Sequence, residues 1–237
     1  MKITIIMPVY NEINTIDKIV QKILNLKFLD IQLIIVDDCS NDGTVEKLKN
    51  LEIFKKINLI IYHSKNQGKG AAIKSAQKFI DGEIVLIQDA DLEYHPHNYQ
   101  KLLEPFLTQN AQIVYGSRVL GKKRYADGSG FVSKSRVFFN HFLTILSNVF
   151  NNQKLTDAHT CYKVFKSQIF KKINLEESDF AFCPEITSKI SKLNIPIIEV
   201  PISYEGRTKK QGKKIGVKDG FRAIYVLFKY RFFSRNV

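Results

Sequence analysis

The sequence predicts an α/β fold in which helices flank a doubly wound, mostly parallel sheet. Along the first half, short apolar runs rich in β-branched residues alternate with segments whose apolar residues recur at helical spacing. The runs cover residues 3–7, 33–36, 59–62, 84–87 and 113–115. Such continuous runs are typical of strands buried on both faces, and their alternation with helices indicates a parallel sheet.

The intervening segments are predicted to be helices. Ile16, Ile19 and Ile23 recur at helical spacing, as do Ala72 and Ala76. In the second half we expect a loop over 119–134, a strand over 161–165, a helix over 184–193 and a strand over 197–204. A helix between that loop and the first of those strands carries a broad apolar stripe, for which we favour packing against the core over a membrane-surface face. The stripe consists of two adjacent rows, Phe138, Phe142, Ile145 and Val149 in one and Phe139, Leu143, Leu146 and Phe150 in the other.

Composition and length indicate one globular domain over residues 1–237. The chain is 44% hydrophobic and 25% charged, which excludes disordered and low-complexity classes. Three cysteines without a CxxC spacing suggest neither a disulfide framework nor a zinc site, and they fit a reducing cytosol. We recognise no signal peptide, and no run approaches the roughly 20 apolar residues of a membrane span.

Polar residues follow every predicted strand, and carboxylates follow three of them. Acidic side chains stand at Glu12, at Asp37 and Asp38, and at Asp89 and Asp91. In an open parallel sheet these strand ends meet along one crevice, where ligands bind. Because like charges repel there, the pattern predicts a bound cation, and the Asp89-Ala90-Asp91 spacing suits Mg²⁺ or Mn²⁺ with substrate phosphates.

The segment Gly68-Lys69-Gly70 opens a predicted helix and has two interpretations. Backbone N–H groups at a helix start can bind phosphate, but a lysine in a tight turn explains the segment equally well. It does not match the phosphate loop of nucleotide hydrolases, and no GxGxxG follows any strand. Nucleotide hydrolysis and dinucleotide redox chemistry are therefore disfavoured.

Five ordered motifs resemble the family-2 inverting glycosyltransferases of GT-A fold. They occupy residues 8–12, 36–44, 66–72, 89–92 and 116–118. Later segments resemble the branch that makes dolichyl- or polyprenyl-phosphate sugars, namely residues 156–157, 161–165, 184–186 and 199–204, with Arg207. The resemblance implies a nucleotide-sugar-binding half over 1–118 and an acceptor-side half over 119–237.

The resemblance also implies roles for individual residues. Pro8, Tyr10, Glu12 and Asp38 would hold the donor nucleoside, with Asp89, Ala90 and Asp91 at its diphosphate. Asp89 and Asp91 would bind Mg²⁺ or Mn²⁺, and Glu93 stands where many relatives have glutamine, which leaves its ligation open. Arg118 and Arg136 would bind the acceptor phosphate. Arg207 and Lys214 would bind phosphates from the late loop, although Lys213 fits the position of Lys214 equally well.

The implied acceptor is a polyprenyl phosphate, and transfer to it requires no strong catalytic base from the protein. A phosphate dianion is a competent nucleophile at neutral pH, so metal and arginine charge suffice without a strong base. Asp91, Arg118 and Asp157 are the catalytic candidates. Asp157 is the base if the acceptor is a hydroxyl, or else it pairs with a basic side chain to fix its loop.

The net charge of +13 is concentrated at the C-terminus, where residues 201–237 hold ten Lys and Arg against two acidic residues. Phe221, Tyr225 and Phe228 share one helical face there, which predicts either peripheral contact with an anionic membrane from the cytosolic face or packing on the sheet. Basic residues around that face are Lys218, Arg222, Lys229, Arg231 and Arg235.

Two other functions remain open at this point. An enzyme of the same fold would glycosylate a saccharide hydroxyl during cell-surface polysaccharide synthesis. A non-enzymatic binder of nucleic acid or another anion would explain the charge. Nucleic acid is not expected as a partner, because no recognised binding motif and no aromatic stacking platform accompanies the basic residues.

Overall fold

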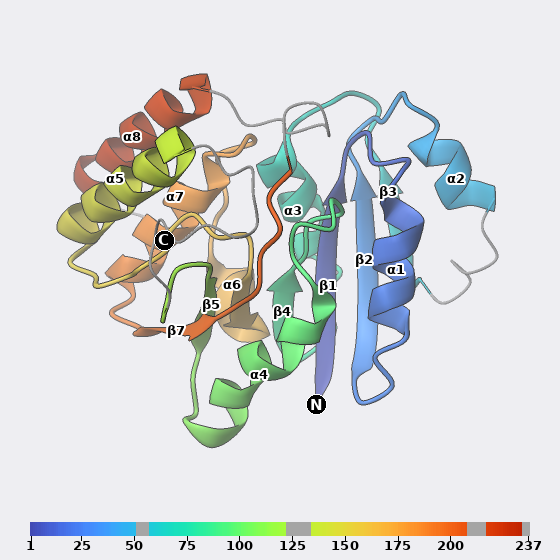
Figure 1. Ribbon diagram of the computed structural model, residues 1–237, viewed down its shortest axis with the longest axis horizontal. Coiled ribbons are helices and arrows are strands. Elements are labelled where there is room, and N and C mark those ends of the chain that lie inside the picture. The colour runs from blue at the N-terminus through green and yellow to red at the C-terminus, as the bar shows by residue number, and fades with distance from the viewer. Residues whose placement is uncertain (51–56, 122–133, 208–216, 234–237) are drawn as a thin grey trace.

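The computed structural model describes residues 1–50, 57–121, 134–207 and 217–233, and within these it does not place the side chains of Asn50, Lys134, Ser135, Arg136 and Val217. A seven-stranded sheet with the order β3-β2-β1-β4-β6-β5-β7 forms the centre (Figure 1). The strands are β1 (Lys2–Val9), β2 (Asp30–Asp37), β3 (Leu59–Tyr62), β4 (Ile84–Ile87), β5 (Ile113–Ser117), β6 (Lys163–Lys166) and β7 (Ile197–Pro201).

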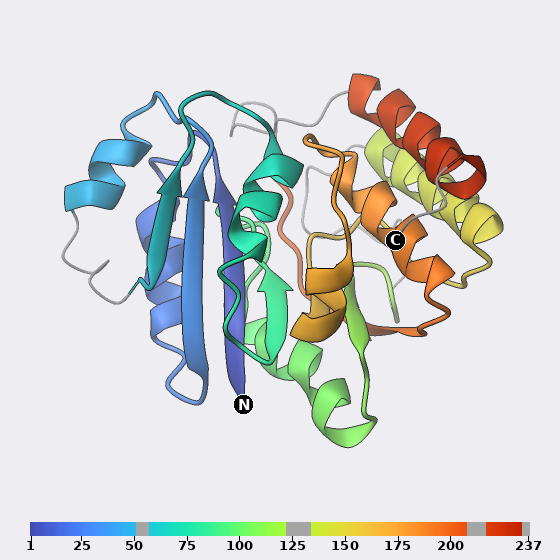
Figure 2. The same ribbon diagram turned by 180° about the vertical axis from the view of Figure 1, so that it is seen from behind.

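Helices cover both faces of this sheet. Figures 1 and 2 show α1 and α4 on one face and α3 and α6 on the other. The helices are α1 (Ile16–Leu24), α2 (Thr44–Asn50), α3 (Lys69–Gln77), α4 (Tyr99–Thr108), α5 (Lys134–Asn151), α6 (Ser167–Lys172), α7 (Phe182–Lys192) and α8 (Val217–Phe232), with a 3₁₀ turn at Pro96–Asn98. The predicted α/β architecture is thus confirmed.

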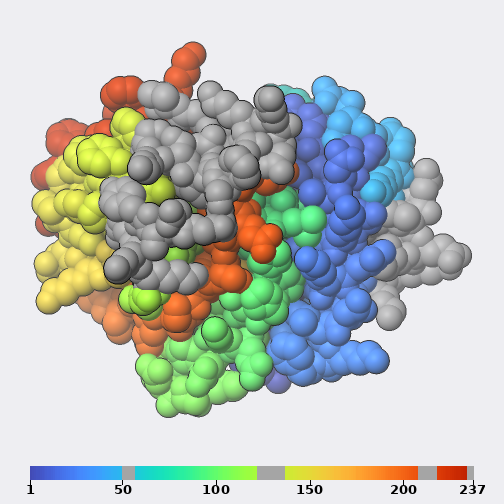
Figure 3. All heavy atoms as spheres, in the orientation of Figure 1, coloured from blue at the N-terminus to red at the C-terminus, as the bar shows by residue number. Residues whose placement is uncertain are grey.

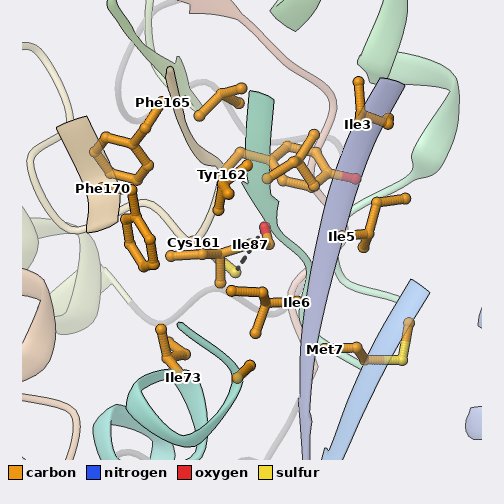
Figure 4. Close-up of a cluster of buried hydrophobic side chains, with 14 of the residues drawn as sticks. Ile3, Ile5, Ile6, Met7, Ile73, Ile87, Cys161, Tyr162, Phe165 and Phe170 are labelled. Carbon is orange, nitrogen blue, oxygen red and sulfur yellow. Dashed lines mark hydrogen bonds between the residues drawn. The ribbon is translucent and has the colours of Figure 1, made fainter. Parts of the chain in front are cut away.

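The core lies along β1, the strand between β2 and β4. Ile3, Ile5, Ile6 and Met7 are all buried, because the sheet is covered on both faces (Figure 4). Consecutive apolar residues on a central strand bury both sides of the pleat, which is why the first run of the sequence does not alternate.

β6 is the exception to the parallel arrangement. It runs antiparallel to both neighbours, with Lys163 opposite Tyr115 in the middle of β5. The predicted strand over 161–165 is therefore displaced to Lys163–Lys166, and the chain enters it from the edge where the other strands end. This orientation brings the segment before β6 to the same edge as the motifs of the first half.

A three-helix group of α5, α7 and α8 lies at the β5–β7 end of the molecule (Figures 1 and 2). Within the described ranges, no helix is both long enough and apolar enough to cross a bilayer.

Candidate active site

The backbone adopts left-handed conformations directly after three central strands. Asn11 follows β1 with φ 52°, Cys39 follows β2 with φ 64°, and Leu92 follows β4 with φ 63°. Such values are uncommon for residues other than glycine, and for Leu92 the conformation is a strained one. Strain of this kind persists where the surrounding structure fixes it and clusters at functional sites.

Asp89 lies at the carboxyl end of β4 and pairs with Lys69, the first residue of α3. Burial lowers the pKa of Lys69, but Asp89 together with the nearby Cys161 and Cys183 raises that pKa well above its usual range. Lys69 is therefore a charged partner of the first carboxylate of the Asp89-Ala90-Asp91 motif. Neither interpretation of the segment, phosphate binding or a lysine in a tight turn, foresaw this ion pair. Phosphate binding stays a prediction.

Asp91 is the second carboxylate of the motif. Burial raises its pKa to about 7, together with the negative charges of Asp89 and Glu93, while Arg207 opposes the shift. Excess negative charge in a confined place is what a divalent cation relieves, and carboxylate oxygens are its preferred ligands. Asp89 and Asp91 thus fit a hard divalent cation, although no three Asp, Glu, His or Cys side chains of the described residues converge as a ready ligand set.

Arg207 reaches across the strand ends and binds Glu12 through both oxygens. Its Nη1 and Nη2 groups donate to the two Glu12 carboxylate oxygens at 2.9 Å each, and Nη2 also lies 3.3 Å from Asp91 Oδ2. Glu12 follows β1 and Asp91 follows β4, so one guanidinium joins two motifs of the donor half. The expected contact of Arg207 with phosphate is a prediction that this arrangement does not test.

Glu93 is a buried carboxylate whose described contacts are with the late segment of the chain. One oxygen accepts the backbone N–H of Arg207 at 2.8 Å, and the other accepts the Tyr204 hydroxyl at 2.9 Å. These contacts tie Glu93 to the segment that carries Tyr204 and Arg207. Its role as a metal ligand stays a prediction.

Asp38 anchors the loop before α3. Its carboxylate accepts the backbone N–H groups of Gln67 at 2.9 Å and Gly68 at 2.6 Å, and it contacts His63 Nδ1 at 2.7 Å. Sequence reasoning gave His63 no role, because only the fold brings it to Asp38.

The remaining expected donor residues line the same edge. Pro8 and Tyr10 are half-buried at the end of β1, and Ala90 is buried between the two aspartates. The structure therefore brings the donor residues of the first half to the carboxyl edge of the sheet.

Arg118 and Asp157 form a buried ion pair on the acceptor side. Arg118 Nε and Nη2 donate to the two Asp157 oxygens at 2.7 and 2.8 Å, and the guanidinium lies over the Tyr204 ring at 5.1 Å. Burial alone would raise the pKa of Asp157, but Arg118 lowers it below its usual range. Asp157 thus pairs with a basic side chain, as one of its two interpretations expects, and its role as a base stays a prediction.

Two charged residues, the half-buried Glu199 and the buried Lys163, hold the Asp157 segment in place. Glu199 on β7 accepts the backbone N–H groups of Thr156 and Asp157 at 2.7 and 2.9 Å. Lys163 is fully buried and donates to the carbonyl oxygens of Ala158 and Thr160 at 2.9 and 2.8 Å. A lysine inside an apolar strand run is the sequence signal that could have identified this support, because buried lysines require partners.

Two predicted phosphate-binding residues cannot be assigned contacts. Arg136 stands in the first turn of α5, but its side chain lies outside the described residues. Lys214 and its alternative Lys213 also lie outside them, as does most of the predicted loop over 119–134.

The expectation that the apolar face of α5 packs against the core is wrong for most of that face. The first of the two rows that we expected in the core is exposed, with Phe138 57% and Val149 70% accessible, whereas Leu143 of the second row is buried. The buried side of α5 instead carries polar residues, including Thr144, Ser147 and Asn151. These small polar side chains bond locally, Thr144 to the Asn140 carbonyl and Asn151 to the Ser147 hydroxyl, and Leu143 is buried beside them. The helix therefore packs on a side that is mostly polar and leaves most of its aromatic residues outward.

α8 packs beside α5 and is exposed in the same way (Figure 3). Val226, Leu227 and Tyr230 are buried, so the helix does pack on the protein. The aromatic face remains outside, and the Phe150 and Phe232 rings meet between the two helices at 6.0 Å. We call this surface the α5–α8 face; its exposed apolar residues are Phe138, Phe139, Phe142, Ile145, Val149, Phe221, Tyr225, Phe228 and Phe232.

Two basic residues predicted to flank this face are engaged in the protein. Arg222 pairs with the buried carboxylate of Glu177, and Lys229 donates to the same residue at 2.8 Å. Lys218 and Arg231 are exposed, whereas Arg235 lies outside the described residues. The predicted basic rim is therefore smaller than the sequence suggested.

Proteins of known activity resemble the whole chain. It is 26% identical to a UDP-N-acetylglucosamine–dolichyl-phosphate N-acetylglucosaminyltransferase of Methanococcus voltae, over 95% of this chain and 94% of that protein. It is 27% identical to a dolichol-phosphate mannosyltransferase of Pyrococcus furiosus, over 97% of this chain but 64% of that longer protein.

Solved structures support the fold independently. Glucosyl-3-phosphoglycerate synthase from Mycobacterium tuberculosis, in a complex with Mn²⁺, UDP and phosphoglyceric acid, superimposes with a TM-score of 0.74 at 16% identity, over 98% of this chain and 79% of that one. A complex of the same enzyme with Mg²⁺ and UDP gives 0.69 at 17% identity, over 97% and 79%. Residues 4–174 match the family described as glycosyl transferase family 2. With these residues and the GT-A-like sheet in agreement, the chain belongs to glycosyl transferase family 2 and is a glycosyltransferase.

Proposed function

We propose that this enzyme transfers a hexose from a nucleotide sugar to a polyprenyl phosphate, with inversion at the anomeric carbon. The observation that carries the proposal is the α5–α8 face, an apolar surface on the acceptor half. Contiguous exposed apolar surface marks a site of protein, ligand or membrane contact. The two curated relatives are named as dolichyl-phosphate transferases, so a lipid-linked acceptor explains both the surface and the similarity.

The donor would bind across the ends of β1, β2 and β4. Pro8, Tyr10, Glu12 and Asp38 are the proposed nucleoside contacts, with Asp38 acting through the loop that it anchors. Asp89 and Asp91 would hold Mg²⁺ or Mn²⁺, which when bound would neutralise the leaving diphosphate. The neighbouring enzyme's complexes with UDP and either metal are consistent with this use of the fold.

The acceptor phosphate would meet Arg118, with Arg136 and Lys214 or Lys213 as further proposed contacts. Asp157 engages Nε and Nη2 of Arg118 and so fixes the guanidinium, whose Nη1 is not part of that pair. A phosphate oxygen would attack the anomeric carbon as the sugar–diphosphate bond breaks, releasing the nucleoside diphosphate. Arginine is suited to this contact because its planar fork binds phosphate with charge-assisted hydrogen bonds.

In the second candidate function, transfer to a saccharide hydroxyl, Asp157 would act as the base. That reaction needs a base with a pKa near neutrality. Arg118 lowers the pKa of Asp157, which makes its carboxylate a weak base. The pair therefore favours a phosphate over a hydroxyl as the acceptor.

A transfer assay tests the reaction. Dolichyl phosphate and a simple hydroxyl acceptor, such as an alkyl glucoside, would be offered with GDP-mannose, UDP-glucose and UDP-N-acetylglucosamine in the presence of Mn²⁺. We expect one sugar to appear on the lipid phosphate and none on the glucoside. Transfer to the glucoside alone would refute the phosphate acceptor.

Membrane contact through the α5–α8 face needs a separate test. The parent and the Phe138→Ser/Phe228→Ser variant would be sedimented with vesicles of phosphatidylcholine and phosphatidylglycerol. The matched control is Phe28→Ser/Leu107→Ser, which changes two exposed apolar residues on α4 and the loop after α1. We expect the first variant to lose binding and the control to keep it. Equal loss in both would rule out a specific membrane face.

A further inference from the structure

Arg207 occupies the place where the proposed donor complex would have to bind. Its guanidinium contacts Glu12 with two hydrogen bonds of 2.9 Å and Asp91 at 3.3 Å. Only 17% of its side chain is exposed, so the contact is enclosed rather than a loose surface pair. Both carboxylates are ones that the donor and its cation would use.

A guanidinium and a divalent cation would both use the negatively charged oxygens of Asp91. Each is stabilised by the carboxylate oxygens, and two cations packed against one carboxylate in a confined site repel each other. Occupancy of Asp91 by one therefore weakens binding of the other. From this geometry we propose that Arg207 and the divalent cation compete for Asp91, so that Arg207 holds the donor site closed until the donor complex displaces it.

Glu93 holds the backbone of Arg207 in place while the Arg207 side chain would exchange partners. It accepts the Arg207 backbone N–H at 2.8 Å and the Tyr204 hydroxyl at 2.9 Å, and the Glu205 N–H bonds to the Glu93 carbonyl at 3.0 Å. An isolated bridge between Tyr94 and Tyr204 holds the same two segments together. With its backbone tied down, Arg207 can exchange partners by side-chain rotation alone. Glu93 is thus a positioning residue for Arg207.

The inference rests on the proposed donor site but needs neither sugar nor acceptor to be known. Binding of Mn²⁺ alone would be measured by titration calorimetry for the parent and for Arg207→Gln, with Asp91→Asn to identify the titrated site. A protein whose competent state is populated one time in ten binds about tenfold more weakly. We accordingly expect Arg207→Gln to bind Mn²⁺ about tenfold more tightly than the parent.

A matched control separates competition from a general change in charge. Arg231→Gln also removes one arginine charge, at an exposed position on α8 away from the strand ends. It should leave Mn²⁺ affinity unchanged. If Arg207→Gln does not fold, Arg207→Lys decides, since lysine keeps the charge but loses the two-pronged contact and should bind Mn²⁺ at an intermediate affinity.

The position of Glu93 has its own test. Glu93→Gln keeps an oxygen that can accept the Arg207 backbone N–H, and its amide N–H can donate to the Tyr204 hydroxyl oxygen, so its Mn²⁺ affinity should stay within about twofold of the parent. Loss of a direct ligand should cost at least the 10- to 100-fold that loss of an outer-shell partner costs. A loss in that range would overturn the positioning role. Unchanged or weaker Mn²⁺ binding by Arg207→Gln would overturn the competition, even if lipid-phosphate transfer were confirmed.

Discussion

The Arg118 guanidinium lies against the Asp157 carboxylate with two hydrogen bonds of 2.7 and 2.8 Å, and the Arg118 backbone N–H donates to the same carboxylate at 3.1 Å. The two residues are 39 positions apart, and the antiparallel direction of β6 brings them together. Arg118 follows β5, while Asp157 precedes β6.

Breaking this pair should destabilise the protein strongly. Arg118→Ala leaves a buried carboxylate without its guanidinium, and we expect a loss of about 3–5 kcal/mol of unfolding free energy, measured by urea denaturation. The double variant Arg118→Met/Asp157→Asn should recover part of that loss, because neither charge is then buried alone. A single-variant loss below about 1 kcal/mol, the range of exposed pairs, would contradict the assignment.

Donor binding should depend on Asp91 and on metal. Asp91→Asn removes a carboxylate at a strand end without creating a cavity, so it should abolish transfer while the unfolding free energy changes little. EDTA should have the same effect on the parent, and Mn²⁺ should reverse it. The control Asp81→Asn alters an exposed aspartate paired with Lys2 and should leave transfer intact. Equal donor affinity in EDTA and Mn²⁺, measured by calorimetry, would refute the metal site.

Two glycines should respond to alanine in opposite directions. A Cβ at Gly70 would lie 2.1 Å from the Glu177 carbonyl oxygen, which is backbone and cannot yield, whereas nothing lies within 4 Å of a Cβ at Gly220 in α8. Gly70→Ala should therefore lose about 1–3 kcal/mol or more through overpacking. Gly220→Ala should gain about 0.5–1 kcal/mol from helix propensity. Thermal unfolding of both variants checks the signs, and a stabilising Gly70→Ala would show that the 177 segment does not pack on α3.

His159 should make the fold sensitive to mild acid. Burial lowers its pKa to about 4, and the positive charge of Lys163 adds to the effect. Because the unfolded chain, with a histidine pKa near 6.5, binds the proton first, stability is complete above about pH 6.5 and falls as the pH drops toward 4.

At pH 5 this histidine alone should remove about 2 kcal/mol of unfolding free energy relative to pH 7.5. The measurement is urea denaturation at both pH values for the parent and for His159→Gln, which cannot titrate. We expect the variant to lose less stability on acidification. An identical pH dependence in both proteins would mean that His159 has the same pKa in the folded and the unfolded chain.

The sequence by itself determined the sheet of the first half and the edge of that sheet where the proposed donor residues gather. Short runs rich in β-branched residues such as 3–7 are typical of central strands, since a strand without alternation is buried on both faces. Parallel strands end along one edge, so Asp38, Asp89 and Asp91 had to meet there. These inferences depend on local patterns, which is why the residues could be identified without coordinates.

Only the tertiary structure decided which charges pair. The partners Arg207 and Glu12 are 195 residues apart, and no spacing rule relates them. The same holds for Lys69 with Asp89 and for Glu177 with Arg222, since an ion pair depends on distance in space rather than along the chain.

The tertiary structure also decided which face of a helix is exposed. In α5 the apolar stripe is wide enough to have packed inward, and its position in the sequence favoured the core. The helix instead buries Thr144 and Ser147, whose hydroxyl groups find local hydrogen-bond partners and leave Phe138 and Phe142 outside. The spacing of apolar residues shows that a helix has an apolar and a polar face. Which of these faces is buried depends on the surface against which the helix packs.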